Sequence, residues 1–173
     1  MVMKESTVTL IHAFISSRLD YCNTLTYGIS STFLRRLQSK QNAAARLVTG
    51  AKKFDHITPV PRELHWVPIR QRIAHKLSLL VYKCLHNAAP VYLSSDCVPV
   101  SLLAGRRQLR SSVSGTLEWV SGQELFLVVA RSECGPATWN ALPTELRTAT
   151  VCLDTFGKQL KTYLFESCSL RAH

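Results

Sequence analysis

Apolar residues recur three or four positions apart along the first half of the chain, the spacing of one face of an α-helix. The first stripe predicts a helix over residues 6–28 that stops at Gly28. Its apolar positions are Val8, Ile11, Ile15, Leu19 and Cys22. The second predicts a helix over residues 30–50, with Ser30 or Ser31 as N-cap and Gly50 as a left-handed C-cap. Its inner side is expected to carry Phe33, Leu34, Leu37, Gln41, Ala44 and Val48.

A third stripe predicts a helix over residues 68–87, where Pro68 suits the first turn. Its inward positions are Ile69, Ile73, Leu77, Leu80, Val81 and Cys84. The preceding segment, "DHITPVPRELHWVP", is expected to be a connector, because each of its prolines removes a backbone donor and disfavours helix before it. We expect the three helices to pack on their apolar stripes. The residues expected to be buried there are Leu37, Val48, Ile73, Leu77 and Leu80.

The character of the chain changes after about residue 95. In "RRQLRSSVSGTLEWVSGQELFLVVARS", partial alternation at Leu117/Trp119 and Phe126/Val128 predicts two or three short strands. "GPATWNALPTELR" predicts short helical turns broken at Pro143, with Trp139 as an anchor whose indole N–H needs a partner. A last helical stripe, interrupted by Gly157, consists of Leu153, Phe156, Leu160, Tyr163 and Leu164.

The predicted fold is therefore mainly α: a three-helix bundle in a domain 1–95, then a mixed tail 96–173 with short strands and a C-terminal helix. At 173 residues, 46% of them apolar, the chain is long enough to bury about two-thirds of its unfolded surface. The run "LSLLVYKCL" is broken by Lys83 well short of the ~20 residues that a membrane span needs. No membrane helix is expected, and the default localisation is cytoplasmic or nuclear.

Charge is distributed unevenly along the chain. The formal net charge is +10, and residues 30–90 hold eleven lysines and arginines against two acids, Asp55 and Glu63. A nearly neutral body with one concentrated basic segment favours a polyanion as the partner. The alternative is that these side chains form ordinary solvated helix faces.

Several kinds of catalytic chemistry find no support in the sequence. A two-metal polymerase or nuclease needs clustered carboxylates, whereas the acids here are few and scattered. The chain has no phosphate-binding glycine loop and no hydrolase or zinc-protease motif. The six cysteines form no C-x-x-C pair and are expected to be reduced and mostly buried. The sequence therefore predicts neither an enzyme nor a metal, cofactor or small-molecule site.

Five blocks of the sequence resemble, in the same order, the C-terminal region of LINE-type (non-LTR) retrotransposon reverse transcriptases. They are "HAFISSRLDYCNTLTYGI", "LRRLQSKQNAAARLVTGAKKFDHITPV", "ELHWVPIRQRIAHKLSLLVYKCLHNAAPVYLSS", "GPATWNALPTELRTA" and "LDTFGKQLKTYLF". The likeness covers about residues 12–165. In that family the region follows the polymerase palm and comprises a helical thumb, which grips the template–primer duplex, and a tail.

The chain also departs from the family pattern. It has no adjacent Asp–Asp pair, no endonuclease domain and no zinc knuckle, and only Glu133 and Cys134 separate "VVARS" from "GPATWNALP". The resemblance thus implies a non-catalytic fragment with a thumb-like bundle that binds the backbone of RNA, DNA or an RNA–DNA hybrid. Arg35, Arg36, Lys40, Arg46, Lys52, Lys53, Arg72, Lys76 and Lys83 are the candidate phosphate contacts. The alternative is an inert or protein-interaction fragment.

Overall fold

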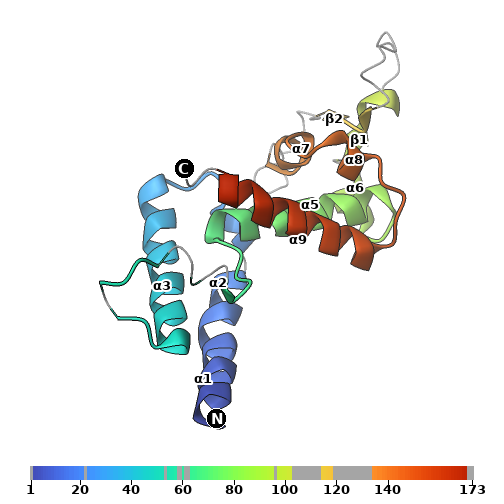
Figure 1. The fold of residues 1–173 in the computed structure, drawn as a ribbon. Coiled ribbons are helices and arrows are strands. Elements are labelled where there is room, and N and C mark those ends of the chain that lie inside the picture. The colour runs from blue at the N-terminus through green and yellow to red at the C-terminus, as the bar shows by residue number, and fades with distance from the viewer. Residues whose placement is uncertain are drawn as a thin grey trace. The chain divides into compact units, whose positions relative to one another are not determined.

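A computed structural model describes residues 2–21, 23–52, 54–57, 60, 63–95, 97–102, 114–118 and 134–170. The described residues are mainly helical with one small antiparallel sheet, as the sequence predicted (Figure 1). It divides into two compact units, residues 1–73 and 74–173, and the division falls inside α5 (Ile69–Leu85). The change of composition near residue 95 lies within the second unit.

The first unit opens with a run of helical segments. It comprises α1 (Val2–Ile11), a π-helical turn (His12–Ser16) and α2 (Ser17–Asp20), and a separate 3₁₀ turn follows at Asn23–Thr26. The predicted continuous helix over residues 6–28 is therefore wrong after Asp20. Asn and Thr side chains bond to nearby backbone and so compete with helix, and the Thr26 hydroxyl indeed donates to the Asn23 carbonyl.

Helix α3 (Ser31–Thr49) confirms the second predicted helix. It ends at Gly50, whose φ of 73° and N–H bond to the Arg46 carbonyl make it the left-handed C-cap that was expected. Ser30 holds the N-cap position without a side-chain cap bond. The predicted inner side is correct for Gln41 and Ala44, both buried, but wrong for Phe33, which is 43% exposed.

The core of the first unit lies between α1, α3 and the proline-rich connector. Its buried members are Ile11, Ala44, Ala45, Val60 and Trp66. Ala44 and Ala45 are fully buried, so two small side chains let the neighbouring segments approach α3 closely. Leu37 and Val48 are only partly buried. Trp66, a connector residue, contributes the largest side chain of this core.

Helix α5 confirms the third predicted helix and most of its apolar face. Ile69, Ile73 and Leu77 are at most 3% exposed, whereas Leu80 is only partly buried. From residue 74 onward the helix belongs to the second unit, where Val81 and Tyr82 join that unit's core. The predicted N-terminal three-helix bundle is therefore not confirmed.

The second unit adds short elements between α5 and a long final helix. They are α6 (Val91–Ser94), β1 (Val98–Pro99), a 3₁₀ turn (Val100–Leu102), β2 (Leu117–Glu118), α7 (Cys134–Asn140), α8 (Thr144–Arg147) and α9 (Leu153–Leu170). The antiparallel strands pair Val98 with Glu118 and Pro99 with Leu117. Leu117 thus lies in a strand as predicted, while Trp119, Phe126 and Val128 lie outside the described residues. Helix α9 continues through Gly157.

Trp139 is the anchor that the sequence predicted. It is 1% exposed, and its indole N–H donates to the Gly115 carbonyl at 2.9 Å. Gly115 has a φ of 65°, and a Cβ there would lie 3.0 Å from the Arg147 carbonyl oxygen, so this position requires glycine. Trp139 packs in one core with side chains from α5, β2, α8 and α9; the other members of that core are Val81, Tyr82, Leu117, Leu142, Leu146, Phe156, Leu160 and Leu164.

Asn140 holds strand β2 with both ends of its side-chain amide. Its Nδ2 donates to the Leu117 carbonyl and its Oδ1 accepts from the Leu117 N–H, each at 2.9 Å. We expect Asn140→Asp to lower the free energy of unfolding by about 1–3 kcal/mol, because the nearly isosteric carboxylate loses the donor and faces a carbonyl. Chemical denaturation measures the loss. The matched control is Gln159→Glu, at an exposed position of α9. Equal denaturation midpoints for the two variants would show that the Asn140 side-chain bonds to Leu117 do not stabilise the fold.

Candidate nucleic-acid interface

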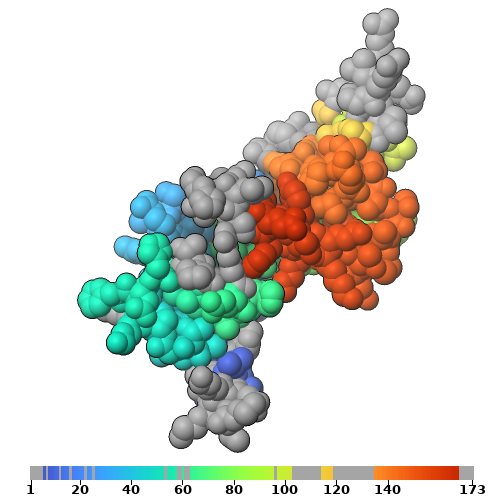
Figure 2. Space-filling view, viewed as in Figure 1, coloured from blue at the N-terminus to red at the C-terminus, as the bar shows by residue number. Residues whose placement is uncertain are grey.

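The solvent-exposed surface of α3 carries three basic side chains. Arg35, Arg36 and Lys40 are all exposed, Arg36 and Lys40 lie one helical turn apart, and Arg36 lies on the side opposite the buried Gln41. Helix α3 contains no acidic residue at all. We call these three residues the α3 basic face. Much of α3 and the segment after it, coloured light blue to turquoise, lies on the visible surface in Figure 2.

Arg36 and Lys40 are the least constrained members of this face. Residues four apart are neighbours on a helix surface, so the two like charges reinforce each other's potential. The Arg35 Nε, in contrast, approaches the Ser31 carbonyl of its own helix at 3.4 Å. Because lysine and arginine bind phosphates as exposed cations, Arg36 and Lys40 are the best placed of the candidates to meet a polyanion.

The two described candidates at the end of α3 are tied to a turn. The Arg46 guanidinium is partly buried and donates from Nη2 to the Asp55 carbonyl at 3.3 Å. The Lys52 backbone N–H donates to the Asp55 carboxylate at 2.7 Å, while its side chain is exposed. Asp55 thus places a negative charge beside this end of the helix. Lys53 lies outside the described residues.

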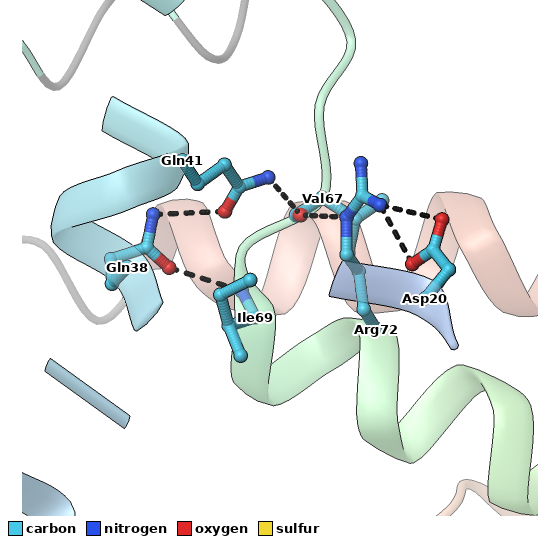
Figure 3. Close-up of polar contacts among 6 residues, drawn as sticks. All are labelled: Asp20, Gln38, Gln41, Val67, Ile69 and Arg72. Atoms are coloured by element: carbon cyan, nitrogen blue, oxygen red, sulfur yellow. Dashed lines mark hydrogen bonds and ion pairs between the residues drawn. The ribbon is translucent and has the colours of Figure 1, made fainter. Parts of the chain in front are cut away.

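Arg72 has a structural role within the first unit (Figure 3). Its Nη1 donates to both carboxylate oxygens of Asp20, at 2.7 and 2.8 Å, and its Nε donates to the Val67 carbonyl at 2.9 Å. The Arg72 side chain is only 16% exposed. A charge-assisted ion pair of this geometry fixes the guanidinium in place. We therefore leave Arg72 out of the candidate interface, although its position on the helix had suggested a phosphate contact.

Two glutamines of α3 complete the contacts in Figure 3. The Gln38 Oε1 accepts from the Ile69 N–H at 3.0 Å, which satisfies one of the backbone donors that the start of α5 would leave unpaired. Gln41, 1% exposed, donates to the Val67 carbonyl at 2.9 Å and accepts from Gln38 at 3.0 Å. These bonds hold the inner side of α3 against the connector and so orient the α3 basic face outward.

The last two candidates lie on the part of α5 that belongs to the second unit. Lys76 is exposed, and Lys83 is partly buried beside α9. The structure thus leaves Arg35, Arg36 and Lys40 exposed on α3, with Arg36 and Lys40 one turn apart, whereas Lys83 joins Lys158 and Lys161 of α9 at a groove. Sequence reasoning passed over Lys158 and Lys161 because a net charge counted over residues 30–90 does not include them.

Cys84, Cys97 and Cys152 are free thiols. Cys84 is buried and Cys97 is partly buried, whereas Cys152 is exposed. Cys152 directly precedes α9, and its carbonyl accepts the Phe156 N–H at 2.9 Å. The hydroxyl of Thr155, 3.0 Å from the sulfur, and then the backbone N–H groups of Thr155 and Asp154 lower the pKa of the Cys152 thiol, because they stabilise the thiolate.

The lowered pKa of Cys152 predicts early reactivity with alkylating reagents. Iodoacetamide modification of Cys152, followed by peptide mass spectrometry, should show an inflection at a lower pH than the same peptide after unfolding. Thr155→Val should move the inflection upward. The pKa of the Cys152 thiol is lower in the folded chain than in the unfolded chain, so ionisation of this thiol adds to the free energy of unfolding. This contribution is fully present above the ordinary thiol pKa and is lost as pH falls through the folded-state pKa. Equal inflections in folded and unfolded protein would contradict the assignment.

The described part of the chain contains neither a metal-binding cluster nor a membrane-spanning helix. Among the described residues, no three His, Cys, Asp or Glu side chains lie together where they could hold a metal ion. No helix in the described ranges is both long and apolar enough to cross a membrane.

Comparisons of the chain with protein families, curated proteins and solved structures found no match.

Proposed function

We propose that this chain binds the sugar–phosphate backbone of nucleic acids without reading base sequence, as a non-catalytic relative of the thumb and tail of LINE-type reverse transcriptases. The ligand class is RNA, DNA or an RNA–DNA hybrid. The proposal needs no cofactor, because it invokes only binding. It rests on two independent kinds of support, the ordered sequence resemblance and the surface of α3.

The observation that carries the proposal is the α3 basic face. Three exposed cations, Arg35, Arg36 and Lys40, lie on a helix without any acid, and Gln38 and Gln41 hold the opposite side of that helix against the connector. A rigid helix with one-signed charge presents a steady positive potential to a polyanion.

The experiment is a salt titration of affinity. Binding of the full chain to a fluorescent RNA–DNA hybrid, measured by anisotropy, should weaken linearly on a plot of log affinity against log salt. Unrelated sequences should give similar affinities at each salt concentration. Affinity that is independent of salt, or absent at low salt, would favour the alternative, in which the chain is inert or contacts another protein through its solvated basic faces.

A further inference from the structure

A groove of about 360 Å³ lies between α5 and α9, entirely within the second unit. Its apolar part is formed by Leu79, Leu153 and Gly157, and its basic part by Lys83, Lys158 and Lys161. We call these six residues the lysine groove. Figure 1 shows α9 running beside α5, and Figure 2 shows α9, in red, at the visible surface. The groove is distinct from the α3 basic face, which belongs to the first unit.

Helices α5 and α9 line the groove on opposite sides, and each contributes lysines to it. The Tyr82 hydroxyl donates to the Val151 carbonyl, while the His75 Nε2 lies 3.3 Å from the Gly157 carbonyl oxygen. These contacts make α5 and α9 antiparallel here. Lys83 therefore reaches the groove from α5, and Lys158 and Lys161 reach it from two successive turns of α9.

Gly157 is the feature that helix packing alone does not explain. It lies inside the 18-residue helix α9, where glycine is a poorer helix former than alanine. A Cβ at this position would lie 3.6 Å from the Leu79 Cδ2, which is an ordinary van der Waals contact, so close approach of the helices does not demand glycine. The missing side chain does keep the floor of the groove open.

The charges in the groove favour an anion. Among the described residues, none of the three lysines forms an ion pair. The groove also contains Asp154, which lies in the first turn of α9, where the positive end of the helix dipole offsets part of its charge. His75 completes the lining, with its Nε2 against the Gly157 carbonyl. Three ammonium groups against one carboxylate leave the groove positive at neutral pH.

We propose that the lysine groove binds one sugar–phosphate unit of a nucleic-acid strand. Three ammonium groups that arrive from two helices suit the several oxygens of a phosphate, whereas a peptide carboxylate is matched best by the planar fork of arginine, which the groove does not contain. The apolar floor suits the carbon face of a sugar. The lining contains no Phe, Tyr or Trp on which a base could stack, and the His75 imidazole faces the Gly157 carbonyl, so the base stays outside and the contact is independent of sequence.

Charge variants of the full chain test the proposal. The probe is a fluorescent single-stranded DNA of about 12 nucleotides in mixed sequence, a length within the usual range for single-strand sites. Lys158→Gln/Lys161→Gln should weaken binding roughly tenfold at low salt, because two phosphate contacts are lost. The control Arg18→Gln/Arg70→Gln removes the same charge from two exposed positions of the first unit and should change affinity less than about twofold. Equal losses in the two variants would overturn the proposal.

Gly157→Ala provides a test that leaves the charge unchanged. The added methyl group occupies the floor beside Leu79 without a steric clash, so the thermal midpoint should stay the same or rise. Affinity for the DNA probe should nevertheless fall about threefold, because the sugar loses its place while phosphate contacts persist. Unchanged affinity with an unchanged or raised midpoint would show that the open floor has no part in binding.

Residue-resolved lysine acetylation separates this proposal from the one for α3. With the DNA probe bound, Lys83, Lys158 and Lys161 should be acetylated at least about threefold more slowly, and Lys40 reports independently on the α3 basic face. Protection of Lys40 alone would overturn the proposal for the lysine groove and leave the α3 proposal standing. Protection of the groove lysines alone would support the lysine groove and overturn the α3 proposal. Equal protection by inorganic phosphate at the same phosphate concentration would show a free-anion site and overturn the assignment to a strand.

Discussion

Replacing Phe156 by alanine is expected to lower the free energy of unfolding by about 3–5 kcal/mol. Phe156 has no exposed surface and lies at the centre of the second unit's core. Its ring stacks on Tyr82, with centroids 4.1 Å apart, and lies 5.9 Å from the Trp139 ring in a tilted arrangement. Removing it leaves a cavity that α5, α7 and α9 all border, and such cores relax only partly around a lost ring.

Urea denaturation followed by circular dichroism measures this effect, and the same substitution at an exposed position provides the control. Phe14 is 68% exposed on the π-helical turn of the first unit, so Phe14→Ala should change the free energy of unfolding by less than about 0.5 kcal/mol. Because the chain has two units, each variant also reports whether they unfold together. Similar losses for the two variants would show that the core of the second unit has been wrongly assigned.

Local signals in the sequence predicted the individual elements well. Gly50 predicted the end of α3, Pro68 predicted the start of α5, and Trp139 beside Asn140 predicted a buried anchor with one hydrogen-bond partner. Each of these signals acts over a few residues, through a positive φ, a missing backbone donor or a buried indole N–H. The chemistry that fixes them is therefore contained in the sequence nearby.

Errors arose where a distant segment decides the outcome. The apolar stripe of α5 was read correctly, but periodicity does not say which segment covers it, and Tyr82 packs against Phe156 of α9 rather than in an N-terminal bundle. Strand β1 at Val98–Pro99 was missed because its partner Leu117 lies beyond an intervening segment. Two-residue strands carry almost no periodic signal of their own.

The candidate phosphate-binding residues show the same limit of sequence-based prediction. Arg36 and Lys40 are exposed, in keeping with the expected outer side of α3. Arg72 shares the same residue type and a similar position on its helix, yet it pairs with Asp20, 52 residues earlier in the chain. Only the folded structure could separate a cation that is used internally from one that faces solvent.

Neutralising Arg36 and Lys40 together is expected to produce the largest change in nucleic-acid affinity of any pair on α3. Both side chains are exposed, and α3 has no acid that would offset them. Each phosphate contact contributes about 0.9 to the slope of log affinity against log salt on duplex DNA, through the release of counterions. The double variant Arg36→Gln/Lys40→Gln should therefore bind at low salt at least tenfold more weakly, which corresponds to about 1.4 kcal/mol.

Base-sequence independence is the second expectation for this pair. If Arg36 and Lys40 meet phosphates, their loss should weaken binding to unrelated sequences by similar factors, whereas base contacts would relax discrimination at particular positions. Thermal unfolding should be nearly unchanged, because both residues project from the surface and surface substitutions cost little. A variant that binds weakly because it is unfolded would be recognised by this second measurement.

The salt dependence of this double variant tests nucleic-acid backbone binding most directly. Anisotropy titrations of a duplex DNA over a range of salt concentrations give the slope for the wild type, for Arg36→Gln/Lys40→Gln and for the equally charged control Arg18→Gln/Arg70→Gln. We expect the slope to become shallower by roughly two units in the α3 variant and to stay the same in the control. A slope that the α3 variant leaves unchanged, in folded protein, would contradict the proposal and identify Arg36 and Lys40 as solvated surface.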